Sequence, residues 1–188
     1  YDYAVGVTGG TLDSVVAWTH VASFETERTV TGLTLTHGTK YSISIRATNC
    51  AGATTTQTSP GVLIDTVPPV PGKVFVGNLT GKHHNKIFRA EHLQASWAGF
   101  TDSTSGIARY EWAMSTYTTP PSIVGNTGLI MGWSDVGLLE FARNGTIANM
   151  PKQALLTVGT DIYVHVKAID NAGNFVIANS NATRIVGF

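Results

Sequence analysis

Gly38-Thr-Lys-Tyr-Ser-Ile-Ser-Ile-Arg-Ala-Thr-Asn-Cys-Ala-Gly52 is the stretch that decides the fold, because the chain repeats its pattern as Gly159-Thr-Asp-Ile-Tyr-Val-His-Val-Lys-Ala-Ile-Asp-Asn-Ala-Gly173. In both copies every second residue is apolar, namely Tyr41, Ile43, Ile45 and Ala47 in the first and Ile162, Val164, Val166 and Ala168 in the second. This alternation predicts a half-buried antiparallel strand, with these residues on a core and the residues between them, including His165, in water. Two such strands at a fixed spacing indicate a repeat protein.

The composition restricts the classes of function. Charged residues make up 13% of the 188 residues, against a usual share of roughly 25%, and the formal net charge is zero. Such a surface offers no electrostatic attraction for nucleic acid or for an anionic membrane, so we expect neither as a partner. No apolar run approaches the roughly 20 residues of a membrane span. The chain opens on Tyr1 rather than on methionine, so we expect a longer polypeptide around it.

Two further segments recur outside the repeated strand. Tyr1-Asp-Tyr-Ala-Val5 matches Tyr110-Glu-Trp-Ala-Met114, and Trp18-Thr-His-Val21 matches Trp133-Ser-Asp-Val136. Between the two sets lies the proline-rich stretch 67–72, whose prolines cannot donate to a ladder and favour an extended connection. We therefore predict a first domain at residues 1–66, a linker at 67–72 and a second domain at 73–188.

The second domain contains a full set of short alternating segments with turn residues between them and no helical periodicity. This pattern predicts a β-sandwich. The expected strands are 73–76, 91–97, 107–115, 132–136, a segment near 146–150, 161–169 and 181–186. In the first domain we expect a short last strand at 61–64.

Leu93-Gln-Ala-Ser-Trp97, Gly106-Ile-Ala-Arg-Tyr110 and the repeated strand together resemble a fibronectin type III or closely related immunoglobulin-like repeat. The resemblance implies that Trp97 is the core tryptophan of strand B. It also implies that Leu33 and Tyr41 form the tyrosine corner beside strand F.

The second domain departs from that pattern, because Ile162 takes the tyrosine position and Tyr163 faces outward. The residues assigned to the structural core are Trp97, Trp112, Trp133, Tyr41 and Leu33. These motifs are structural, so the resemblance implies a fold and not an activity.

The first domain is predicted to be incomplete. Tyr1 aligns with Tyr110, which belongs to strand C, so strands A and B have no counterpart before it. The expected fold class is all-β, with two tandem antiparallel β-sandwiches of which the first, strands C to G, lacks strands A and B. Such a domain exposes a sheet edge and half of its core. Either upstream residues of the same chain or a strand from a neighbouring molecule would fill the gap, the latter by donor-strand complementation. The expected partners are therefore copies in a polymer or neighbouring repeats.

The candidate metal ligands of this chain are histidines and carboxylates. Adjacent histidines of one strand point to opposite sides, so we interpret His83 and His84, with His92 nearby, as a solvated loop. Calcium needs about six to eight oxygen ligands. The candidate carboxylates are Asp65, Asp102, Asp135 and Asp170. No segment holds two of them close together, and we expect Asp170 and Asn171 to build a turn instead. We predict no metal and no cofactor.

No catalytic pattern stands out. The chain has no Gly-x-Ser-x-Gly, no glycine-rich phosphate cradle and no pair of acids near a cleft-forming loop. Its single cysteine, Cys50, closes no disulfide within the chain and is either a free thiol or bonded to a partner. We expect the protein not to be an enzyme.

Three sequons favour a glycosylated extracellular protein, at Asn78, Asn144 and Asn181. Hydroxyl-rich runs ending at proline supply candidate O-glycosylation sites at Thr54, Thr55, Thr56, Thr118 and Thr119. Candidate interface residues are Tyr1, Tyr3 and Tyr163. We predict a structural subunit of a fibril or stalk, with glycans as further partners. The alternative is an adhesion or receptor ectodomain that binds a protein or carbohydrate through its loops.

Overall fold

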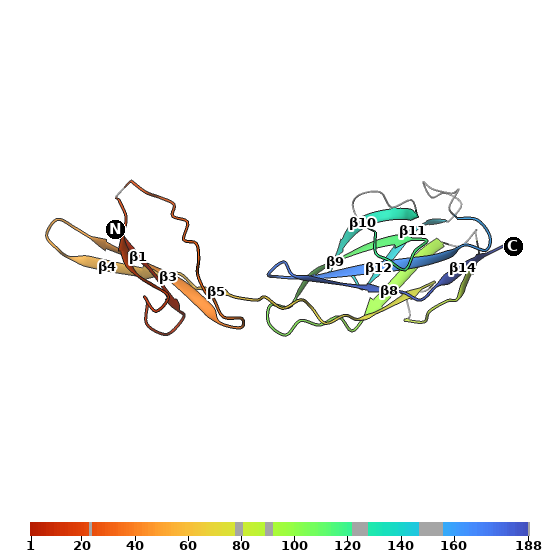
Figure 1. The fold of residues 1–188 in the computed structure, drawn as a ribbon, viewed down its shortest axis with the longest axis horizontal. Helices are drawn as coiled ribbons and strands as arrows, with labels where there is room; N and C mark the ends of the chain where they lie inside the picture. The colour runs from red at the N-terminus through yellow and green to blue at the C-terminus, as the bar shows by residue number, and fades with distance from the viewer. Residues whose placement is uncertain (23, 78–80, 89–91, 122–127, 147–155, 188) are drawn as a thin grey trace. The chain divides into compact units, whose positions relative to one another are not determined.

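The computed structural model describes residues 1–22, 24–77, 81–88, 92–121, 128–146 and 156–187. Within these ranges the chain is all-β and contains no helix (Figure 1). It divides into two compact units, Tyr1–Thr66 and Val67–Phe188. The division falls at the start of the proline-rich stretch 67–72.

The described strands of the first unit all lie in one antiparallel sheet. They are β1 (Asp2–Val7), β2 (Val16–His20), β3 (Lys40–Thr48), β4 (Thr54–Thr58) and β5 (Val62–Leu63). The order is β2-β1-β3-β4, and β5 also pairs with β3. Between β2 and β3, residues 24–37 belong to no strand and arch beside the sheet in Figure 1.

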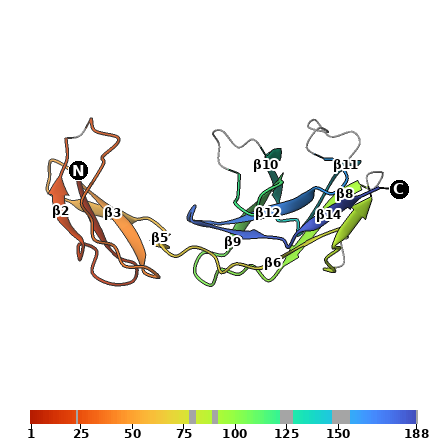
Figure 2. The same ribbon diagram turned by 45° about the vertical axis from the view of Figure 1, so that its right-hand side comes forward.

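The second unit contains two sheets. One has the order β10-β9-β12-β14-β7 with β13 paired to β12, and the other has the order β11-β8-β6. Figure 2 shows β6 on one side of the unit and β10 on the other. The strands are β6 (Lys73–Val76), β7 (Lys86–Phe88), β8 (His92–Ala98), β9 (Ile107–Ser115), β10 (Leu129–Gly137), β11 (Phe141–Thr146), β12 (Asp161–Asp170), β13 (Phe175–Asn179) and β14 (Thr183–Val186).

The core of the second unit lies between these sheets. Leu93, Ala95 and Trp97 of β8 are buried, as their alternation predicts, and they pack with Trp112 of β9. The Tyr110 and Phe100 rings pack in a T-shaped arrangement with their centroids 5.7 Å apart. A single apolar cluster thus holds the two layers together.

Some elements differ from the expected strands. Strands β4, β7 and β13 were not expected, and β14 pairs with β7 in parallel whereas the other strand pairs of the described chain are antiparallel. Every residue of β4 is exposed, so it carries no alternating apolar signal. The strand expected near 146–150 is β11, which starts at Phe141, and residues 147–150 lie outside the described ranges.

The two units repeat one backbone frame, by which we mean the same strand pairing in the same register. Tyr3 stands opposite Ile45 in the β1–β3 pair, as Trp112 stands opposite Val166 in the β9–β12 pair. Ile45 and Val166 are separated by the same number of residues along the chain as the turn residues Asn49 and Asp170.

The turns after β3 and β12 have the same construction. Asn49 and Asp170 each accept two backbone N–H bonds through Oδ1, at 2.8 to 3.0 Å. Each turn closes on a left-handed glycine, Gly52 (φ 79°) or Gly173 (φ 91°), a conformation that a Cβ would strain. The expected turn at Asp170 is therefore confirmed. Strand register and turn chemistry agree between the units.

Candidate interaction surface

The apolar face of β1 and β3 is open in the first unit. Ile43 and Ile45 are 53% and 50% exposed, although their alternation predicts that they face a core. The equivalent residues of β12, Val164 and Val166, are both 0% exposed. The expected inner face is therefore present in the first unit, but within the described residues it is only partly covered.

Tyr1 gives the same contrast. Its side chain is 53% exposed, whereas the matching Tyr110 is 4% exposed. In the second unit Trp97 of β8 covers Tyr110 edge-on, with the ring centroids 5.8 Å apart. Burial raises the pKa of the Tyr110 phenol above its ordinary value. The cover over Tyr110 thus comes from the second sheet of its unit, and the first unit has no second sheet among its described strands.

A groove of about 690 Å³ runs along this open face. Its floor includes Tyr3, Ile43 and Ile45 of the sheet, and its far wall includes Val30 and Leu33 from the arched segment. These side chains are large and apolar, so covering them would release ordered water. We call this surface, with Tyr1, the open face.

Tyr41 fixes one end of the arched segment. Its phenol oxygen accepts a hydrogen bond from the Thr36 backbone N–H at 3.0 Å. That bond is the main reason why the pKa of Tyr41 lies below its ordinary value. Tyr41 and Leu33 are only partly buried, so neither is a closed core residue as expected, because their face is open. In the second unit Ile162 replaces the tyrosine and is fully buried.

The opposite face of the sheet carries a charge cluster. Arg46 Nη2 donates to Asp2 Oδ2 at 2.9 Å, and the Arg46 guanidinium lies 4.4 Å from the Trp18 ring centroid. Hydrogen bonds from Arg46 and then His20 hold the pKa of the Asp2 carboxyl below its usual value. The expected interface residue Tyr3 lies on the other, apolar side.

The second unit repeats this cluster with different residues. Lys167 Nζ donates to Glu111 Oε2 at 3.0 Å and lies 5.6 Å from the Trp133 ring centroid. Trp133 is partly exposed and also donates from Nε1 to the Pro121 carbonyl oxygen at 3.2 Å. It therefore lies outside the buried core to which the sequence assigned it. Its equivalence to Trp18 reflects a shared surface contact with a cation.

His165 was expected in water, and it is 0% exposed. Its Nε2 lies 2.8 Å from Ser115 Oγ and its Nδ1 lies 2.8 Å from Asn179 Oδ1. Burial lowers the pKa of the imidazole below its ordinary value. Ser115 is also 0% exposed, whereas Asn179 at the end of β13 is exposed, so this network is a polar clamp whose serine and histidine are buried and offer no accessible nucleophile.

No pattern in the sequence predicts this clamp. Asn179 belongs to β13, which was not expected, and its Nδ2 donates to the Thr118 carbonyl oxygen at 2.8 Å. At this point β13 therefore lies beside β12 in the sheet, and the chain around Thr118 covers the outward face. A prediction of β13 as the strand that pairs with β12 is needed to place Asn179 opposite His165.

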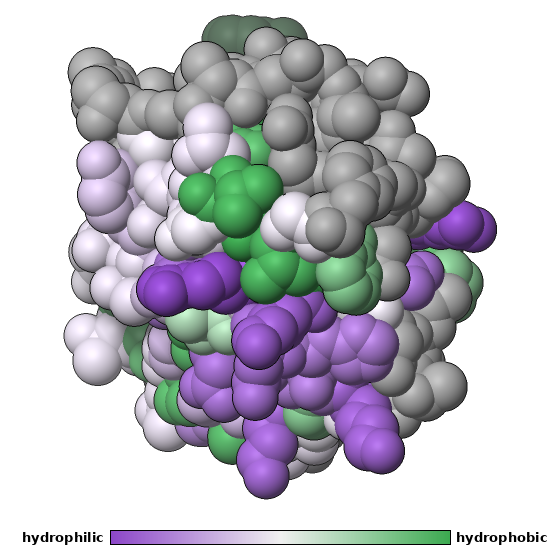
Figure 3. Space-filling model, turned by 90° about the vertical axis from the view of Figure 1, so that its right-hand side faces the viewer, coloured by the Kyte–Doolittle hydropathy of each residue, from purple (hydrophilic) through white to green (hydrophobic). Residues whose placement is uncertain are grey.

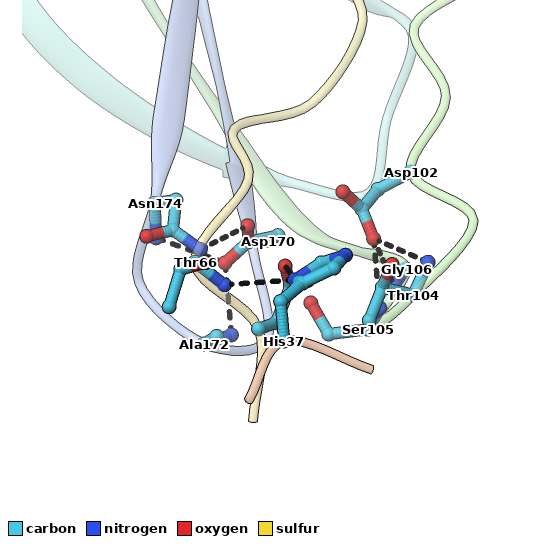
Figure 4. A network of polar contacts seen from close by, with 10 residues as sticks. His37, Thr66, Asp102, Thr104, Ser105, Gly106, Asp170, Ala172 and Asn174 are labelled. Atoms are coloured by element: carbon cyan, nitrogen blue, oxygen red, sulfur yellow. Dashed lines mark hydrogen bonds and ion pairs between the residues drawn. The ribbon is translucent and has the colours of Figure 1, made fainter. Parts of the chain in front are cut away.

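Two calcium candidates lie close together in the second unit. Carboxylate oxygens of Asp102 and Asp170 come within 4.8 Å of each other, which the sequence reasoning missed because the residues are far apart along the chain. Asp102 Oδ1 accepts backbone N–H bonds from Thr104, Ser105 and Gly106 (Figure 4). Both acids therefore act as turn formers.

The other metal candidates are also engaged or exposed. His83 Nδ1 accepts from the Val76 N–H at 3.3 Å and His83 Nε2 lies 3.1 Å from the Ala182 carbonyl oxygen. Asp135 Oδ2 is 3.3 Å from Arg109 Nε. The side chain of His92 lies outside the described part.

In the first unit, His37 Nδ1 is 3.3 Å from an oxygen of Asp65, and it also accepts the Thr66 N–H at 3.2 Å (Figure 4). Cys50 is an exposed free thiol in the turn that follows β3. Among the described residues of the first unit, neither the His37–Asp65 contact nor Cys50 forms a cluster of three or more candidate metal ligands.

The glycosylation candidates are distributed over both units. Asn181 is exposed, Asn78 lies outside the described residues, and Asn144 is in β11 with its side chain outside the description. The O-glycosylation candidates are exposed, and three of them belong to β4 instead of a loop: Thr54, Thr55 and Thr56, with Thr118 and Thr119 in the second unit. Tyr163 is partly buried on β12.

The face of the molecule in Figure 3 carries both hydrophilic and hydrophobic residues. Hydrophilic residues form a continuous group on its lower half, and a smaller hydrophobic group lies directly above it. None of the described residues forms a helix that is long and apolar enough to cross a membrane.

Comparison with known proteins adds no assignment: no family model and no curated protein matches this chain.

Proposed function

We propose that this protein is a non-catalytic structural subunit of an extracellular, glycosylated fibril or stalk built from tandem β-sandwich repeats. In this proposal both units are repeats of the fibronectin type III or immunoglobulin-like kind. The first is a partial sandwich whose strands A and B come from elsewhere, and the chain is one link of an array.

The observation that carries the proposal is the exposure of Tyr1, Ile43 and Ile45 in a backbone frame whose second copy buries the same positions. Half-exposed aromatic and β-branched side chains on one sheet face favour association, since a monomer rarely keeps a large contiguous apolar patch in water. The exposed apolar face therefore favours binding of the first unit to another protein segment.

The second unit supports a mechanical role. Its polar groups are engaged in turns and clamps, among them Asp102, Asp170 and the buried Ser115–His165 pair. A proline-rich stretch at 67–72 joins the units, and Pro-rich connections act as semi-rigid spacers. The exposed threonines of β4 and the exposed Asn181 suit a glycan coat.

The test is the state of assembly of native material. Negative-stain microscopy should show filaments, and sedimentation should give a polymeric mass that persists on dilution. An Ile43→Asp, Ile45→Asp variant should lose this assembly, because it places two charges on the open face. Thr48→Asp is the control, since it adds a charge at an exposed position of the same strand outside the groove.

The opposite result has a clear form. A monodisperse monomer that binds a protein or carbohydrate saturably through the chain between Thr116 and Trp133 would replace the fibril with the adhesion or receptor ectodomain.

A further inference from the structure

We infer that the open face binds a pair of antiparallel β-strands of the β6–β8 type, supplied by an adjoining sandwich repeat. This inference rests on the proposed function and names the partner of the same surface. It follows from using the second unit as a template for the first.

The template is valid because the two frames share one register. Val5 stands opposite Ile43 as Met114 stands opposite Val164. Side chains on the two faces therefore occupy equivalent positions, since a slip of one residue would move each of them to the other side of the sheet. An occupant that fits the face of β9 and β12 has matching contacts on β1 and β3.

The second unit shows the chemistry of that occupant. β8 presents Leu93, Ala95 and Trp97 to the core, all of them buried, and β6 pairs antiparallel beside it. Trp97 stands over Tyr110, the counterpart of Tyr1. The occupant therefore alternates apolar and polar residues, with an aromatic ring at the position that meets Tyr1.

The backbone of the arched segment offers the incoming strand a partner. In the second unit β11 pairs antiparallel with β8, with Ala142 opposite Ala95. Counted from the matched residues Trp18 and Trp133, the part of the first unit that corresponds to β11 is residues 26–31. It belongs to no strand, and it lines the groove through residues that include Thr26 and Val30. An added β8-type strand would pair with this segment, which is recognition by β-augmentation.

The experiment uses the full chain, labelled with nitrogen-15, and a synthetic peptide of residues 73–98 extended by two lysines at each end for solubility. Binding is followed by amide chemical shifts and by hydrogen exchange. We expect saturable binding of one peptide per chain. Amides of residues 26–31 and of β1 and β3 should shift, and exchange at 26–31 should slow at least tenfold.

The control is the same peptide with Leu93→Ser and Trp97→Ser, which keeps its length and charge. Its affinity should fall at least tenfold. Equal affinity for both peptides, or no saturable binding of the native one, would overturn the inference. So would a concentration-dependent dimer that slows exchange on the open face without any peptide, because a second copy would then be the occupant.

The two proposals fail separately. Peptide binding by a protein that forms no filaments would retain the strand-pair site and remove the fibril. Filaments formed by a protein that does not bind the peptide would retain the fibril and remove the strand-pair site.

Discussion

Truncation of one matched pair of residues should show how differently the two units use the same strand. Ile45 and Val166 occupy equivalent positions, opposite Tyr3 and Trp112, but Ile45 is half exposed and Val166 is fully buried. Replacing each by alanine removes three carbons from Ile45 and two from Val166. The number of carbons removed would by itself make the isoleucine change the more costly.

The structure reverses that order. At about 0.8 kcal/mol per buried carbon, half-exposed Ile45 loses about 1 kcal/mol and leaves no enclosed cavity. Val166→Ala loses about 1.6 kcal/mol by the same rule, and the cavity it leaves in a closed core raises the total to about 2–3 kcal/mol. The smaller truncation is thus expected to cost at least 1 kcal/mol more by these rules.

Hydrogen exchange at increasing urea concentrations, followed by mass spectrometry, measures this because peptides from each unit report on its own unfolding. Each variant is compared with the unchanged chain, and the unit that carries no substitution is the internal control. An Ile45→Ala cost equal to or above that of Val166→Ala would refute the reasoning, since it would mean that Ile45 is packed in solution.

Three further outcomes are expected. Trp97→Ala should destabilise the second unit by about 3–5 kcal/mol in urea unfolding, and a cost near zero would mean that β8 does not supply the core. Burial lowers the pKa of His165 from 6.5, so the unfolded state binds a proton more readily; the second unit should lose stability as the pH falls below 6.5, and His165→Gln should flatten that pH profile. An unchanged pH profile in the His165→Gln variant would mean that another group causes the loss of stability. Intact mass of native material should show glycan on at least one of Asn78, Asn144 and Asn181, whereas three bare asparagines would contradict an extracellular location.

Two opposed contributions decide whether the folded second unit favours the neutral or the protonated form of His165. Ser115 Oγ lies 2.8 Å from both His165 Nε2 and the Tyr117 carbonyl oxygen, and its single proton can serve only one of them. A charged imidazole would donate to Ser115 and satisfy both, a gain of about 1 kcal/mol. Burying an unpaired charge costs several kcal/mol, so the neutral form is favoured.

Charged neighbours do not alter that conclusion. The titratable groups on the same face of these strands as His165 are Asp161, Tyr163 and Lys167 on β12, and Arg109 and Glu111 on β9; Asp161 is paired with Arg184 at 2.7 Å. Lys167 and Glu111 already pair with each other at 3.0 Å. The strand β13 carries no charged residue, and Tyr117 is the titratable group in the segment 116–121.

The alternation in the repeated stretch is sufficient to predict β3 and β12, because period two is a local property of a strand. It distinguishes two faces but does not say which one is covered. Ile43 and Val164 have the same place in the pattern and opposite burial, since burial depends on a second sheet. The burial of His165 was missed for a related reason, because β13 places Asn179 opposite it and the chain at Tyr117 and Thr118 lies against that face.

The approach of Asp102 to Asp170 was also beyond the sequence. Each acid follows its own local turn rule, which the sequence does show. Their proximity depends on how the turns at the ends of β9 and β12 meet, where Asn171 Nδ2 donates to the Ser105 carbonyl oxygen at 2.8 Å. Such contacts between distant segments leave no periodic signal.

The most direct test of the open face is a chimera in which residues 67–109 are copied in front of Tyr1, so that β6 and β8 lead into β1 as they lead into β9. Covering the half-exposed Tyr1, Ile43 and Ile45 should add about 1 kcal/mol for each side chain, or about 3 kcal/mol in total, to the stability of the first unit. A version of the copied segment with Leu93→Ser and Trp97→Ser should lose most of this gain. If the free energy of unfolding of the first unit, measured by hydrogen exchange, is the same with and without the added strands, the first unit is already complete and the account is contradicted.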